Sequence, residues 1–232
     1  MNFKYLLLMS ILITALTLPF SSTHAMETNS AEALELGEYN KFLPTGKITR
    51  FAGESLYYDI SFLWFENAAS AKVSFFEENG KYFSVLEAST TGFVGFFTSY
   101  RQHFYKTEFE VINNGRTLRP TTFLRQVTIA NTIETTNHKF DYSRRLHTWE
   151  KRLNEEKVDH GQSEIPVEGA INDILTSFYN IRNSVYGILE KGKKFVIRTI
   201  PEKGHGEISV HIWSEQDQES FRIEEGREEK NS

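Results

Sequence analysis

The sequence contains no cysteine, and this absence removes two kinds of covalent support. Disulfide bonds cannot form, although an exported protein would meet conditions in which they persist. A bacterial lipoprotein carries its lipid on a cysteine at the cleavage site, so a lipid anchor is excluded as well. The stability of the fold must therefore come from its own core, unless a metal or a partner contributes.

Recognisable catalytic and metal-binding motifs are absent too. Ser177 has neither a GxSxG elbow nor a nearby base. Glu54 and Asp59 would fall on opposite faces of a strand. None of the histidines after residue 25 shows HxxxH or HExxH spacing; they are His103, His138, His147, His160, His205 and His211. We therefore expect no metal and no cofactor, and we favour a non-enzymatic protein over an enzyme.

An excess of basic residues is missing as well. The chain has 26 Lys and Arg against 31 Asp and Glu, a net charge of −5. Nucleic acids require clustered basic residues, so they are excluded as partners. The same charge argues against binding to an anionic membrane by electrostatics alone.

What the sequence does have at its start is the pattern of a secretory signal peptide. Lys4 precedes an apolar run over residues 5–20, and small residues follow, with Thr23 and Ala25 placed for cleavage before Met26. The run is about 16 residues, shorter than the roughly 20 that a spanning helix needs. We expect a signal peptide over 1–25 and a protein exported to the periplasm, with no transmembrane helix after cleavage. A retained anchor is the alternative.

The rest of the chain shows the period-two alternation and aromatic richness of β-strands. Residues 26–50 read as an exposed lead-in, residues 51–223 as a single β-rich domain, and residues 224–232 as a charged, disordered tail. Turn signals such as Asn79-Gly80 connect the strands into an antiparallel meander. Strands are expected over 54–65, 68–76, 81–91, 99–111, 116–128, 131–142, 145–153, 194–200 and 207–213, with a further one at 220–223.

One segment has a helical period instead. Apolar residues at Ile171, Ile174, Leu175, Phe178 and Ile181 have helical spacing, which predicts a helix near 168–186 with one buried face. The expected fold is therefore mainly β. It is a large curved antiparallel sheet (meander, barrel-like or two-layer) with this one packed α-helix.

Several side chains are candidates for ligand contact. Residues 92–97 read as a bend or bulge, and their phenylalanines either line a pocket or interface or fill the core. Trp64 poses the same choice. Arg182 either faces an anionic ligand group or satisfies a carboxylate or strand carbonyls where the helix docks, and we favour the second. The candidate ligand-binding residues are Trp64, Phe93, Phe96, Phe97, Tyr179 and Arg182.

Three short motifs resemble a bacterial envelope family known as domain of unknown function 3108. They are Gly53-Glu54-x-Leu56-x-Tyr58, the Pro-containing segment 119–123, and the helix segment from Asp173 to Arg182. The resemblance covers roughly residues 50–215. It implies an exported β-rich domain and carries no catalytic residues to transfer. The charged tail follows soon after Ile223, where further strands are expected of such a domain, which puts full closure of a barrel in doubt.

These observations lead to three functional hypotheses. The first is a non-enzymatic periplasmic protein that binds a lipid-like, amphipathic ligand or an envelope protein, because a curved sheet with a helix over it forms an apolar groove. The second is a hydrolase acting on an envelope glycan or lipid. The third is a structural module of an envelope complex, which would expose an apolar patch or an open strand edge.

Overall fold

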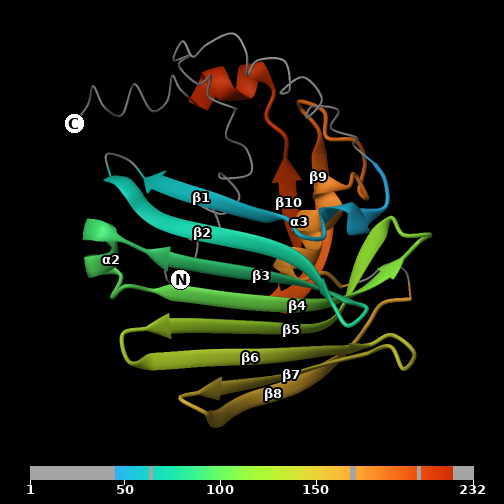
Figure 1. The fold of residues 1–232 in the computed structure, drawn as a ribbon, viewed down its shortest axis with the longest axis horizontal. Coiled ribbons are helices and arrows are strands. Elements are labelled where there is room, and N and C mark those ends of the chain that lie inside the picture. Colours follow the sequence, from blue (N-terminus) through green and yellow to red (C-terminus); the bar gives the residue numbers. More distant parts are fainter. Residues whose placement is uncertain (1–44, 63–64, 168–170, 203–204, 222–232) are drawn as a thin grey trace.

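The computed structural model describes residues 45–62, 65–167, 171–202 and 205–221. Its main element is an eight-stranded antiparallel sheet in which every strand pairs with its neighbour in sequence (Figure 1). The first and last strands do not pair, so the sheet is open. The strands are β1 (Ser55–Phe62), β2 (Phe65–Glu78), β3 (Lys81–Thr90), β4 (Gln102–Ile112), β5 (Thr117–Ile129), β6 (Thr132–Asp141), β7 (Leu146–Leu153) and β8 (Glu156–Glu164).

Besides a helical segment at residues 215–221, the smaller elements are two helices, a 3₁₀ turn and a hairpin. They are η2 (Ile48–Phe51), α2 (Gly92–Phe97), α3 (Ile174–Arg182), β9 (Lys194–Glu202) and β10 (His205–His211). The expected mainly β fold, with a large curved antiparallel sheet and one packed helix, is confirmed. Among the described residues, no helix is long and apolar enough to cross a membrane.

Alternation along the strands gives the sheet a distinct inner face, defined here as the face against which α3 packs. In β1, Tyr58 and Ile60 pack against the core, whereas Tyr57 is 73% exposed on the other side. The main core cluster combines Val73, Phe75 and Leu86 from β2 and β3 with Phe109, Leu118 and α3 residues. The sheet therefore has a solvated outer face and an inner face covered in part by α3.

Two polar side chains fix α3 on the sheet. Asp173 caps the helix by accepting hydrogen bonds from the backbone N–H groups of Leu175 and Thr176, and it also accepts one from the Thr107 hydroxyl of β4 at 2.8 Å. Burial raises the pKa of Asp173 despite these bonds. The Asn180 amide bonds both the N–H and the C=O of Leu118, at 2.8 and 2.9 Å. Since β6 pairs with β5 only from residue 122 onward, Asn180 replaces a missing strand partner there.

The β9–β10 hairpin forms a second layer that is separate from the main sheet. Its inward residues Ile197 and Val210 pack on Ile181 of α3. Outside its own ladder, the hairpin is joined to the chain by an isolated bridge between Asn172 and Thr199. A two-stranded hairpin is marginally stable alone, so packing on α3 holds this one in place.

The structure corrects several boundaries. Residues 92–97 form the short helix α2 and not a bulge, and residues 215–221 are helical, so 220 and 221 do not form a strand. Residues 66–67, which separate two of the expected strands, lie inside β2. Helix α3 is shorter than the predicted 168–186, and β8 had no prediction. Of the expected lead-in, Ile48 is fully buried and its N–H donates to Gly115 O at 2.7 Å. The predicted signal peptide and charged tail lie outside the described residues.

Candidate functional site

An apolar cavity of about 130 Å³ lies between the inner face of β1–β3 and the layer formed by α3 and the hairpin. Tyr58, Ile60, Ala71, Val73 and Leu86 contribute from the sheet. The other wall consists of Ile174, Leu175, Ser177, Phe178, Ile181, Arg182, Leu189, Ile197, Ile208, Val210 and Ile212. This lining is almost wholly aliphatic and aromatic, which suits an apolar guest.

Arg182 borders the cavity, but its charge is already paired. Its guanidinium donates to both carboxylate oxygens of Glu54, with Nη2 to Oε2 at 2.9 Å, and it lies 4.5 Å from the ring centroid of Phe51. Burial acts to lower the pKa of Arg182, but the hydrogen bonds and charge of Glu54 outweigh it and raise the pKa. The arginine therefore fixes the end of α3 to the start of β1, as the packing alternative expected.

Farther along the inner face, Arg125, Glu134 and Lys151 form a charged cluster. Arg125 Nη1 and Lys151 Nζ contact the two Glu134 carboxylate oxygens at 2.8 and 2.7 Å. Burial acts to raise the pKa of Glu134, but the hydrogen bonds and charges of the two cations outweigh it, so the pKa is lowered overall. The three side chains stay 20–36% exposed. The cluster therefore carries a net positive charge that solvent can reach.

Two aromatic side chains of β4 lie between the cavity and the charged cluster. Tyr105 pairs in register with Leu86 of the cavity on one side and with Arg125 on the other. His103 Nδ1 lies 2.8 Å from the Tyr105 hydroxyl. Burial, and then the charges of Arg101 and Arg125, lower the pKa of His103 to about 4. Since strands are about 4.8 Å apart, the cluster begins roughly 10 Å from the cavity.

A stacked pair of histidines lies deeper in the same half of the sheet. His138 and His147 have ring centroids 5.2 Å apart, and His138 Nδ1 is 3.0 Å from His147 Nε2. His147 Nδ1 contacts the Ser163 hydroxyl at 3.1 Å. Burial lowers their pKa values to about 3 and about 4, so both are neutral at pH 7. No group of three or more metal-ligating side chains occurs in the described part of the chain.

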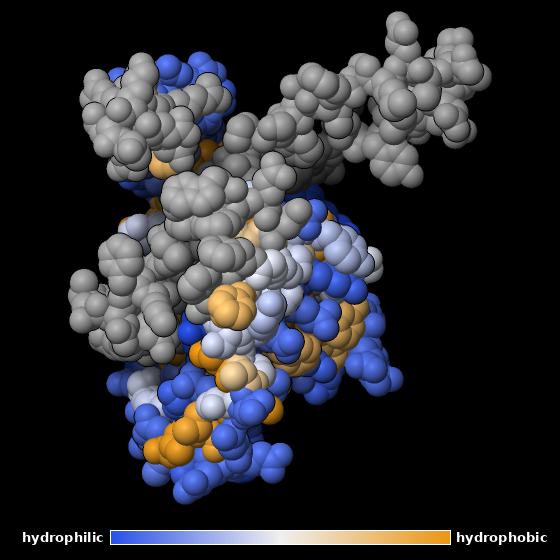
Figure 2. Space-filling model, turned by 90° about the vertical axis from the view of Figure 1, so that its left-hand side faces the viewer, coloured by the Kyte–Doolittle hydropathy of each residue, from blue (hydrophilic) through white to orange (hydrophobic). Residues whose placement is uncertain are grey.

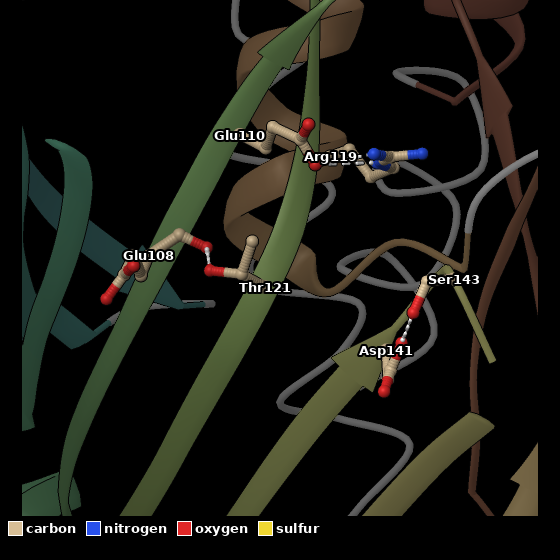
Figure 3. A network of polar contacts seen from close by, with 6 residues as sticks. All are labelled: Glu108, Glu110, Arg119, Thr121, Asp141 and Ser143. Carbon is tan, nitrogen blue, oxygen red and sulfur yellow. Dashed lines mark hydrogen bonds and ion pairs between the residues drawn. The ribbon is translucent and has the colours of Figure 1, made fainter. Parts of the chain in front are cut away.

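The outer face carries a larger hollow of about 950 Å³ over β5–β8, lined by residues that include Lys139, Glu150, Lys157 and His160. Within it, Lys157 pairs with Glu150 at 3.1 Å, and Glu150 also pairs with Arg152. Similar polar contacts cover the turn ends of β4–β6 (Figure 3), where the Thr121 hydroxyl donates to Glu108 O, Arg119 Nε to Glu110 Oε2, and the Ser143 hydroxyl to Asp141 Oδ1. The lining of the hollow itself also includes Phe123, Leu124 and Trp149.

The structure distributes the predicted ligand residues over separate regions. Trp64 lies outside the described residues, and so do the side chains of Phe93 and Phe97 in α2. Phe96 is 68% exposed, whereas Tyr179 is fully buried beside Phe75. Their ligand roles remain predictions. The charged cluster was not predicted from the sequence. The turn at residues 130–131 could have indicated it, because that turn sets the register in which β5 pairs with β6.

Comparison with known proteins gives one match. The family model described as "Protein of unknown function (DUF3108)" matches residues 57–219, which extend from β1 through the hairpin. No curated protein and no solved structure matches the chain. The matched segment contains both the apolar cavity and the charged cluster. Because the match covers more than half of the chain, the chain belongs to the DUF3108 family.

Proposed function

We propose that this protein binds an anionic amphipathic molecule on the inner face of its sheet, with the apolar part in the cavity and the anionic group at the charged cluster. The single observation that carries the proposal is their arrangement: one sheet face holds an apolar cavity and two solvent-accessible cations, of which Arg125 lies two strands and Lys151 four strands from the cavity residue Leu86. The signal-peptide pattern over residues 1–25 supports a periplasmic location for this proposed binding.

The size of the cavity limits what enters it. A dry apolar cavity of roughly 150 Å³ accommodates a benzene-sized group, so about 130 Å³ takes a chain end or a small ring. Each buried methylene contributes about 0.8 kcal/mol. A longer chain would need the β9–β10 hairpin to move outward, and the hairpin is held mainly by its packing on α3.

The charged cluster supplies a matching headgroup site. Arg125 presents a guanidinium, which suits carboxylates and phosphates because it can donate two parallel hydrogen bonds. Lys151 adds a second cation, and Glu134 offsets only one of the two. An incoming anion would share these cations with Glu134.

The geometry gives less support to hydrolysis. A carboxyl group that acts as a general acid needs a raised pKa. The pKa of Glu134 is lowered by its two cations, and Asp173, whose pKa is raised, is buried at the start of α3. The neighbouring histidines are neutral and hydrogen-bonded to one another or to nearby hydroxyl groups. A binding role needs no change in the protonation state of these groups.

Isothermal titration with octanoate and with 1-octanol tests the proposal, because the two probes share a chain and differ in charge. The exported protein should bind octanoate at least about tenfold more tightly, since a charge-assisted hydrogen bond contributes about 1.5–3 kcal/mol. Arg125→Gln should remove this preference, and Glu134→Gln should increase it. The control Lys139→Gln, on the outer face, should leave it unchanged. Equal affinity for both probes, or no binding of either, would sink the proposal.

A further inference from the structure

The connection between β3 and β4, residues 91–101, presents aromatic side chains to solvent at one end of the sheet; we call it the α2 corner. Within it, Phe96 is 68% and Tyr100 is 57% exposed. Figure 1 shows α2 projecting beyond the strands at the left, and Figure 2, which faces that end, shows separate hydrophobic areas within a hydrophilic surface. Exposed aromatic side chains at a projecting corner indicate a contact surface.

Hydrogen bonds hold the α2 corner in a defined shape. The Thr98 hydroxyl donates to Val94 O at 2.8 Å, and the Tyr100 N–H donates to Gly95 O at 2.7 Å. Ser99 and Tyr100 both have left-handed φ values, 57° and 47°. Two consecutive non-glycine residues in this region are uncommon and cost free energy. The surrounding structure thus maintains an exposed aromatic tip at a cost in stability.

Gly95 contributes to the shape of the corner by leaving space for the Tyr100 ring. A Cβ atom at this position would lie 2.8 Å from Cδ1 of the Tyr100 ring and 3.1 Å from Thr90 O. The ring therefore lies directly on the glycine backbone. This contact fixes the ring beside the helix while one side of it remains open to solvent.

The α2 corner also differs in charge from the rest of the chain. The protein is acidic overall, yet no Asp or Glu occurs between Glu87 and Glu108. Within the corner itself, residues 91–101, the single charged residue is Arg101. An aromatic tip whose own residues carry one positive and no negative charge is complementary to an anionic lipid surface.

We propose that the α2 corner docks the protein onto a lipid bilayer that contains anionic headgroups, with Phe96 and Tyr100 entering the interfacial region. The contact area favours a bilayer over a protein partner. Two aromatic side chains bury roughly 300–500 Å² at most, whereas a stable protein interface needs roughly 800 Å² on each side. A shallow aromatic insertion gives weak, reversible membrane binding. These residues are separate from the cavity and the charged cluster, so the docking and the ligand-binding proposals can fail independently.

Vesicle flotation tests the docking directly. The exported protein is mixed with vesicles of phosphatidylethanolamine and phosphatidylglycerol, or of phosphatidylcholine alone, and should float with the anionic vesicles. Phe96→Ser should weaken the binding about tenfold or more, since burying a phenylalanine contributes about 1.5–3 kcal/mol. The matched control is Tyr57→Ser, which removes a more exposed aromatic ring, 73%, from the outer face of β1. Flotation that is absent, or equal for both variants, would overturn the proposal.

The absence of cysteine allows a second, local measurement. Phe96→Cys and Tyr57→Cys each create one site for a polarity-sensitive dye. On addition of the anionic vesicles, the dye at 96 should shift to shorter wavelength while the dye at 57 should not. The contrary result, a shift at 57 alone or at neither site, rejects docking through the α2 corner, and thermal melts of both variants show whether they are folded.

Discussion

The two halves of the inner face are built from different chemistry on one continuous meander. In the β1–β4 half, Phe75 contacts Phe109 and Tyr179, with ring centroids 5.8 and 4.8 Å apart. In the β5–β8 half, the inner face instead carries the stacked pair His138 and His147. The first half is held by apolar packing under α3. The second half combines a smaller apolar cluster, which includes Phe123 and Phe140, with histidines that stack on these rings.

This difference shows where the fold has room for function. Burying a polar group without a hydrogen bond costs free energy. The second half accepts histidines and charges because each has a partner, as Arg125 and Lys151 have in Glu134. Ligand chemistry can therefore be placed there without disturbing the core that holds the sheet together.

The largest effect should come from truncating the centre of the apolar half. Phe75→Ala removes the ring that packs against Phe109 and Tyr179 and should cost about 3–5 kcal/mol in the free energy of unfolding. The adjacent control, Phe76→Ala, removes a ring from the outer face, where it stacks on Phe83, and should cost about 1 kcal/mol. Urea unfolding measures the free energy of unfolding of both variants. Similar losses in the two would contradict the difference expected between the inner and the outer face.

The edge of the polar half should respond to a single methyl group. A Cβ atom at position 161 would lie 2.2 Å from Cζ2 of Trp149, whose ring covers this glycine. Gly161→Ala must displace that ring and should cost about 2 kcal/mol, with a change in tryptophan fluorescence. Gln162→Ala on the same strand provides the control, and we expect it to change stability by less than about 0.5 kcal/mol.

The buried histidines of the inner face should make the protein lose stability in acid. The pKa values of His103, His138 and His147 are about 4, 3 and 4 in the folded protein, below the ordinary 6.5. The unfolded chain therefore takes up protons first, and stability should fall from about pH 6.5 to pH 4 by about 1.4 kcal/mol per pH unit for each histidine. Denaturant titrations at several pH values measure this slope.

A double variant isolates the contribution of the histidine pair. His138→Gln with His147→Gln should remove most of the slope, whatever its effect at pH 7. The raised pKa of Asp173 acts in the opposite direction, because it favours the folded state as the pH falls. A slope that is unchanged in the double variant would show that these histidines do not titrate as their burial implies.

The smallest effect should come from the outer face. Glu110 pairs with Arg119, but the two side chains are 49% and 26% exposed. Glu110→Gln should change the free energy of unfolding by less than about 1 kcal/mol, because solvent screens exposed ion pairs. A larger loss, measured in the same unfolding assay, would mean that the outer face shares the structural role of the inner one.

The sequence predicted the fold where periodicity is strong. The alternation of Leu56, Tyr58 and Ile60 and the turn at Asn79-Gly80 placed β1–β3 in a meander, and pairing in the structure follows that order. Strand β8 escaped prediction because its sequence, EKVDHGQSE, has almost no apolar alternation. It is a strand because β7 offers it a backbone partner, and that information is not local.

The site was harder to predict, because it depends on register. Arg125, Glu134 and Lys151 belong to three strands and approach one another only once β5, β6 and β7 are aligned. The α2 helix was misjudged for another reason: two glycines in six residues weaken the helical pattern and suggest a bulge. Tertiary contacts, such as Tyr100 on Gly95, complete that helix.

The order in which the strands pair has a consequence for the growing chain. Each of the eight strands finds its partner in the segment made just before it, so the sheet can assemble as the chain emerges. The helix and hairpin that cover the cavity come last, from residue 174 onward. A chain interrupted before that point would have a nearly complete sheet with its apolar face uncovered. The final quarter of the sequence thus covers an apolar surface that would otherwise favour aggregation of the incomplete chain.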